Sequence, residues 1–108
     1  MPKRLPKLPT MLWSAGGPVR IRRAKDLRDE DEVVLDGEWR PQVREVLIHA
    51  DLAPEAAWHV LGHEMTHAWL DDGGFREAKS EVVERVCDAV ANGLALNLWM
   101  QGSRGVTG

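Results

Sequence analysis

The chain has 108 residues, and 44% of them are hydrophobic, which suits one domain with a single core rather than two domains. Its single cysteine excludes an intrachain disulfide, and no stretch approaches the roughly 18 consecutive apolar residues that a membrane-spanning helix needs. We therefore expect a soluble, cytoplasmic protein without a signal peptide or a transmembrane segment.

The formal net charge of −3 hides an uneven distribution along the chain. Residues 1–25 contain seven basic and no acidic side chains, whereas residues 26–108 contain seven basic and 17 acidic ones. Several early prolines also disfavour regular structure there. We expect residues 1–17 to form a solvated basic arm, held by the acidic body, with contact to nucleic acid as the alternative.

Three apolar-rich stretches after the arm predict β-strands. Residues 19–23 alternate between apolar and basic side chains, and residues 32–39 and 44–49 form two further stretches joined near Pro41. A tighter hairpin that turns at Gly37 is the alternative.

Strands followed by helices predict an α+β domain that covers residues 18–101. We expect a small three-stranded, mostly antiparallel sheet packed on two main helices. Residues 102–108 predict a flexible tail, because three of these seven residues are glycine.

Residues 54–70 predict an amphipathic helix. Pro54 suits the first helical position, and Glu55 follows in the first turn, where a negative charge is favourable. At 100° per residue, the face of His63 also carries Ala56, His59, His67 and Leu70. The opposite face carries the larger apolar residues Trp58, Leu61, Met65, Ala68 and Trp69. One face therefore packs, while the other can hold ligands.

The segment from His63 to His67 reads H-E-x-x-H, a pattern typical of zinc metalloproteases. Residues four apart share one face of a helix, so His63 and His67 can bind the same ion. Glu64 lies about 100° further round, where it can reach a water molecule on that ion. The pattern predicts one Zn²⁺ per chain and Glu64 as the general base. An exposed polar pair without metal is the alternative.

A catalytic zinc ion usually has three protein ligands, so another segment must supply one more. Residues 80–100 predict a second helix with Ser80 as its N-cap. One stripe of this helix carries Glu84, Cys87, Asp88, Ala91, Ala95 and Leu98. Its small residues would allow close approach to the first helix, so Glu84 is the predicted third ligand. Glu81 and the thiolate of Cys87 are alternatives, although a lone helical cysteine is more often a small buried residue.

Asp88 lies one turn beyond Glu84 and can accept the spare N–H of a ligating histidine. With these residues the chain resembles the gluzincin branch of zinc metallopeptidases, in which H-E-x-x-H is followed by a helix carrying E-x-x-x-D. Residues 45–55, which precede the first helix, also resemble the entry to that helix in small ImmA/IrrE-like or phage-encoded zincins and in minigluzincins.

The resemblance implies a zincin-like fold and a zinc metalloendopeptidase that acts on a protein or peptide substrate. In zincins the edge strand beside the active-site helix pairs with the substrate, which makes residues 44–49 a candidate rim. Many relatives stabilise the oxyanion with Tyr or His, but this chain has no tyrosine. His49, His59 and Arg85 are the remaining candidates. We therefore expect slow or selective hydrolysis, or alternatively a zinc-stabilised binding or regulatory module.

Overall fold

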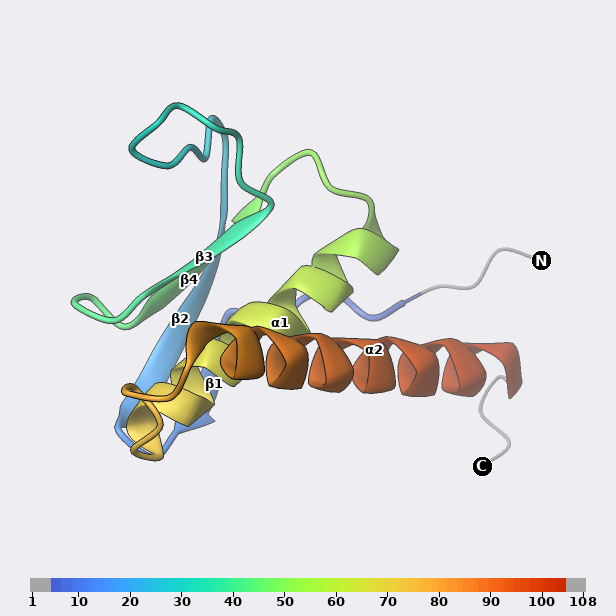
Figure 1. Ribbon diagram of the computed structural model, residues 1–108. Helices are drawn as coiled ribbons and strands as arrows, with labels where there is room; N and C mark the ends of the chain where they lie inside the picture. The colour runs from blue at the N-terminus through green and yellow to red at the C-terminus, as the bar shows by residue number, and fades with distance from the viewer. Residues whose placement is uncertain (1–4, 105–108) are drawn as a thin grey trace.

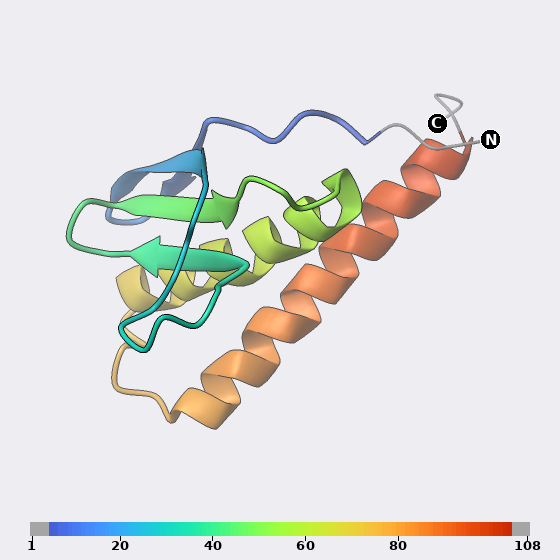
Figure 2. The same ribbon diagram turned by 90° about the horizontal axis from the view of Figure 1, so that it is seen from above.

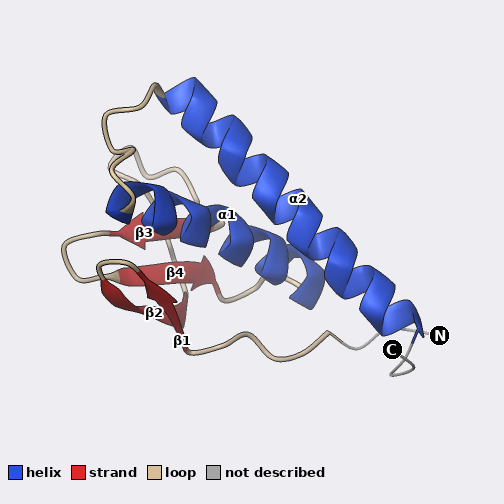
Figure 3. Ribbon diagram, turned by 90° about the horizontal axis from the view of Figure 1, so that it is seen from below, coloured by secondary structure: helices blue, strands red, loops and turns tan. Residues whose placement is uncertain are grey.

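The computed structural model describes residues 5–104, which form one sheet and two helices in an α+β arrangement. In chain order the elements are β1 (Met11–Ser14), β2 (Gly17–Ala24), β3 (Gly37–Arg40), β4 (Glu45–His49), α1 (Pro54–Asp72) and α2 (Ser80–Arg104) (Figure 1). Figures 2 and 3 both show α1 between the sheet and α2. Among these elements α2 packs only on α1, so any site shared by the two helices lies away from the sheet's core.

The sheet has four strands in the order β1-β2-β4-β3. β1 and β2 form an antiparallel hairpin, β2 and β4 are parallel, and β3 and β4 are antiparallel. The α+β class is confirmed, but the predicted three-stranded, mostly antiparallel sheet is wrong. Residues 25–36 carry the chain past the position beside β2, so β3 forms at the edge and β4 returns into the gap. The β3–β4 turn contains Pro41, and Gly37 is the first residue of β3.

The fourth strand, β1, lies inside the segment that we predicted to be a solvated arm. It has only four residues, and its side chains alternate between exposed and half-buried. Ahead of it, the carbonyl oxygen of Pro6 accepts a 2.8 Å hydrogen bond from the indole N–H of Trp58. The described part of the arm therefore packs on the domain, whereas Lys3 and Arg4 lie outside the described residues.

The hydrophobic core lies between the sheet and α1. Its buried members come from β2, β4 and α1: Val19, Ile21, Val46, Ile48, Ala57, Leu61, Met65 and Ala68. The strands contribute alternate residues and the helix contributes residues three or four apart, as the two periodicities require. The predicted apolar face of α1 is confirmed for Leu61, Met65 and Ala68. Trp69 differs, because it is 42% exposed and donates its indole N–H to the carbonyl oxygen of Trp13 in β1.

Small residues allow α1 and α2 to approach closely. A Cβ atom on Gly62 would lie 3.1 Å from the Cα of Ala91, and the side chains of Cys87 and Ala91 are fully buried. The predicted small-residue contact is thus confirmed for these two positions, while the side chain of Ala95 lies outside the described part. α2 continues to Arg104, so the first three residues of the predicted tail are helical, and residues 105–108 lie outside the described range.

Candidate metal centre

Polar contacts connect α1 and α2 at successive helical turns. They pair side chains 2.9–3.0 Å apart: His59 with Asn92, His63 with Asp88, and His67 with Glu84. The paired residues are four apart on each helix and run in opposite directions, as the facing sides of two antiparallel helices require. We call these contacts the polar ladder. It brings the predicted ligands of both helices together.

Glu84 contacts both histidines of the motif. Its carboxylate oxygens lie 3.1 Å from Nε2 of His63 and 3.0 Å from Nε2 of His67. Ligand atoms at about 2.0–2.2 Å from a tetrahedral zinc ion lie about 3.3–3.6 Å from one another, so a small outward movement would accommodate the ion. Glu81 is exposed and makes no ion pair with either histidine in the described structure. The geometry therefore brings Glu84, and not Glu81, to the two imidazoles.

The two carboxylates that face the ring of His63 indicate what fits between these groups. Its Nδ1 lies 2.9 Å from a carboxylate oxygen of Asp88, which accepts hydrogen bonds only, so Nδ1 carries the proton. In the neutral ring Nε2 then has a free lone pair, yet it faces the Glu84 carboxylate at 3.1 Å. Two such acceptors repel each other unless a proton or a cation lies between them. The donor set and its geometry therefore fit a metal ion.

Cys87 belongs to the same cluster. Its Sγ and one nitrogen from each of His63 and His67 lie within 4.8 Å of one another, so these three residues could hold a metal ion. Burial, and then the nearby charge of Glu84, raise the pKa of the thiol to about 12. Without a cation the thiol is therefore protonated at neutral pH. The cluster thus contains four potential donors, two on each helix.

Glu64 faces the cluster from α1. Its side chain is 15% exposed, and one carboxylate oxygen lies 4.0 Å from Nε2 of His63. Burial raises the pKa of Glu64, while His67, His63 and a hydrogen bond from the backbone N–H of Trp39 act in the opposite direction. A carboxyl group whose pKa is raised retains a transferred proton better than an exposed one does, which is the property of a general base.

The two histidines considered for the oxyanion lie in different surroundings. His49 is at the end of β4, where its Nδ1 accepts a 3.1 Å hydrogen bond from the backbone N–H of Asp51, and it takes no part in the metal cluster. His59 lies one turn before His63 and lines the same cavity as Glu64. Only His59 is therefore close to the predicted site.

A cavity of about 260 Å³ lies beside the cluster. It is lined by Asp36, Gly37, His59, Val60, His63 and Glu64. Gly37 is required where β3 meets α1, because a Cβ atom at this position would collide with a methyl group of Val60. β3 and α1 therefore enclose a small space next to the proposed base.

The edge strand beside this cavity is β3. β4 pairs with β2 on one side and with β3 on the other, so it has no open edge for a substrate. The prediction that residues 44–49 form an edge strand beside the site is therefore wrong. Within the described chain β3 pairs only with β4, and it contacts α1 directly.

Sequence analysis missed Asp36 and Trp39 as residues of the site and treated Gly37 only as a turn candidate. The one local signal was an Asp-Gly pair before an apolar stretch, which also fits an ordinary hairpin turn. No protein-family model matches the chain, and no curated protein matches it. None of the described helices combines the length and the apolar composition that crossing a membrane requires.

Proposed function

We propose that this protein is a zinc-dependent metallopeptidase that hydrolyses peptide bonds. His63, His67 and Glu84 would hold one zinc ion, Asp88 would orient His63, and Glu64 would act as the general base. The observation that carries the proposal is the convergence of one carboxylate on two imidazole nitrogens, at 3.0 and 3.1 Å. Two imidazoles and a carboxylate are a donor set that favours zinc over Mg²⁺ or Ca²⁺.

Each of these residues would then have a defined role in hydrolysis. A bound zinc ion would lower the pKa of a water molecule and polarise the scissile carbonyl. Glu64 would accept the proton of the attacking water while the new C–O bond forms, and would pass that proton to the amine nitrogen as the C–N bond breaks. Trp39 of β3 lies close enough to lower the pKa of Glu64, so the base would lie beside the edge along which an extended peptide would bind.

Few side chains in this protein could donate a hydrogen bond to the oxyanion that forms during peptide hydrolysis. There is no tyrosine, and His59 is held by Asn92 at 2.9 Å. Loss of one oxyanion donor typically lowers a rate by about 10²–10³. We therefore propose slow or selective hydrolysis rather than general proteolysis.

Metal content and peptide cleavage test the proposal together. Zinc per chain is measured by elemental mass spectrometry on the wild type, Glu84→Ala and the matched control Glu81→Ala, all without a histidine tag. We expect one zinc per chain in the wild type and in Glu81→Ala, and none in Glu84→Ala. Glu64→Gln should keep its zinc and lose hydrolysis of a peptide library. Cleavage at the wild-type rate by a pure Glu64→Gln sample would refute the assigned base.

A second candidate function is a zinc-stabilised binding or regulatory module without catalysis. The observation that favours it is the position of Cys87, whose thiol could join the histidines and Glu84 to give four protein donors. Four protein ligands close a zinc site and leave no position for water. Replacement of zinc by Co²⁺ distinguishes the two functions, because a thiolate ligand gives an intense charge-transfer band in the near ultraviolet. This band, lost in Cys87→Ser, would favour the closed site.

A further inference from the structure

The cavity beside Glu64 is built to accept one side chain. Its volume of about 260 Å³ is smaller than the roughly 300–1,000 Å³ of typical small-molecule sites. Val60 gives it an apolar wall, and Gly37 contributes no side chain that would fill it. Because the cavity lies between the edge strand β3 and the helix that carries Glu64, a peptide along β3 would place one side chain in it.

One exposed carboxylate at this cavity, that of Asp36, has no partner among the side chains that the structure describes. Asp36 uses its backbone carbonyl to accept a 2.8 Å hydrogen bond from the N–H of His49, but its side chain makes no hydrogen bond or ion pair with any group that the structure describes. By contrast, Glu38, which lies two residues later in β3, is paired with Arg40. Asp36 is therefore free to bind a positively charged group.

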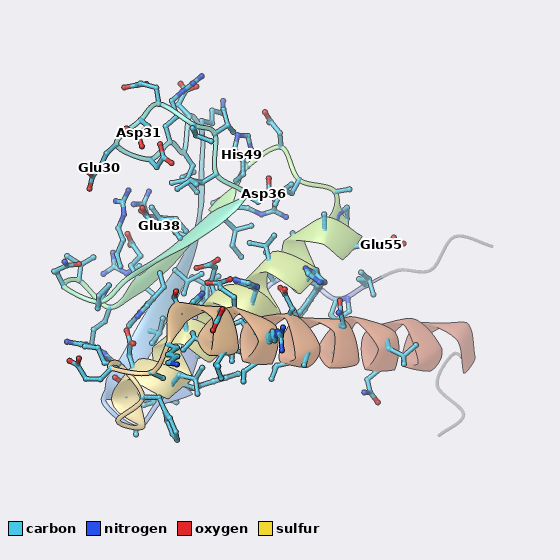
Figure 4. The ribbon with its side chains drawn as sticks, in the orientation of Figure 1. Glu30, Asp31, Asp36, Glu38, His49 and Glu55 are labelled. Carbon is cyan, nitrogen blue, oxygen red and sulfur yellow. The ribbon has the colours of Figure 1, made fainter. Side chains whose placement is uncertain are left out.

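Figure 4 shows that Asp36 lies apart from Glu30 and Asp31, the acidic residues earlier in the same loop. Glu30 and Asp31 lie at the far end of the loop between β2 and β3, whereas Asp36 lies where this loop returns to the sheet. Asp36 alone among these three lines the cavity. The first two therefore contribute at most a diffuse negative field, while Asp36 can form a direct contact.

The charge around the cavity favours a cation. Its lining contains the carboxylates of Asp36 and Glu64 and no lysine or arginine, and Glu84 and Asp88 contact the adjoining histidines. Four carboxylates exceed the charge of one divalent ion, so the negative potential persists when a metal is bound. An acidic substrate side chain would be repelled, and a lysine or arginine would be attracted.

We infer that Asp36 is a specificity residue, and that the cavity selects a lysine or arginine side chain next to the bond that is cleaved. This inference rests on the proposed peptidase function. The aliphatic part of the basic side chain would contact Val60, and its charged end would pair with Asp36. The natural substrate would therefore be a basic segment of a protein.

Direct binding of a small probe tests this without requiring cleavage. The zinc-loaded protein is titrated with N-acetyl-lysine N-methylamide and with the uncharged N-acetyl-norleucine N-methylamide, and backbone amide shifts are followed by NMR. We expect the lysine probe to shift the amides of residues 36, 37 and 60 at about fivefold lower concentration than the norleucine probe. Asp36→Asn should remove this difference, and Asp31→Asn, the matched control on the same loop, should keep it.

Cleavage-site profiling of a proteome-derived peptide library gives the second measurement. The wild type and Asp31→Asn should cut beside lysine or arginine, and Asp36→Lys should shift the preference towards glutamate. Equal binding of the two probes, or a lysine preference that survives Asp36→Asn, would overturn the inference. If peptides are cut without a basic preference, the inference fails and the peptidase proposal stands. If the lysine probe binds through Asp36 but no peptide is cut, the peptidase proposal fails instead.

Discussion

Replacement of Asp88 tests whether the polar ladder holds a metal ligand in position. The Asp88 carboxylate lies 2.9 Å from Nδ1 of His63, so Asp88→Ala leaves that N–H to water and frees the ring to turn. Loss of such an outer contact typically weakens metal binding by 10–100-fold. The side chain of Asp88 is 60% exposed, and water therefore replaces part of the lost contact. We expect the low end of this range, about a tenfold higher Kd for zinc, or about 1.4 kcal/mol.

Zinc affinity is measured by competition with a chromophoric chelator, and folding is checked by circular dichroism. Asn92→Ala is the matched control, because Asn92 makes a contact of the same length to His59, one turn away from the predicted ligands. Asp88→Asn keeps an acceptor oxygen and should lose less than tenfold. An unchanged Kd in Asp88→Ala would refute the orienting role. An equal loss in Asn92→Ala would show that the ladder acts through helix packing alone.

Two further predictions concern contacts between α1 and the sheet with its turns. Asp72 accepts hydrogen bonds from Arg44 at 2.7 Å and from the backbone N–H of Gly16 at 2.9 Å. We expect Asp72→Ala to lower the free energy of unfolding by about 2 kcal/mol and Tm by about 10 °C; a thermal melt with an unchanged Tm would contradict this. These contacts hold the pKa of Asp72 below its ordinary value of 3.8. The stabilisation is therefore complete above about pH 4 and is lost as the pH falls below that value, so the difference between wild type and variant in urea unfolding should shrink in acid. Gly37→Ala places a Cβ against Val60 and should cost about 1–3 kcal/mol in the same urea assay, whereas a neutral result would show that β3 can move away from α1.

The helices and the strands β2 and β4 could be predicted because their signals are local, whereas the predicted strand at 32–39 overlaps β3 only from Gly37 onwards. Residues four apart mark α1, and alternating residues mark β2, whichever elements they finally contact. β1 was missed because four residues next to prolines carry too short a pattern. The parallel pairing of β2 with β4 could not be predicted, since it depends on how residues 25–36 cross the fold.

The same distinction applies to the site. The spacing of His63 and His67 fixes their common face through helix geometry alone. The approach of Glu84 and Asp88 to these histidines also requires that α2 lie antiparallel on α1. The small residues Gly62 and Ala91 indicate that the two helices can pack closely. Asp36 reaches the cavity only because β3 is the edge strand. No spacing in the sequence encodes that order, because either strand of the β3–β4 hairpin could have occupied the edge.

Exposure distinguishes an open metal site from a closed one. The side chain of Glu84 is 52% exposed, so solvent reaches it. Cys87 is fully buried between the helices, and its thiol would have to lose a proton from a group whose pKa is raised to about 12. The burial of Cys87 and the raised pKa of its thiol therefore support the proposed open site, in which the two histidines and Glu84 would leave the fourth position to water.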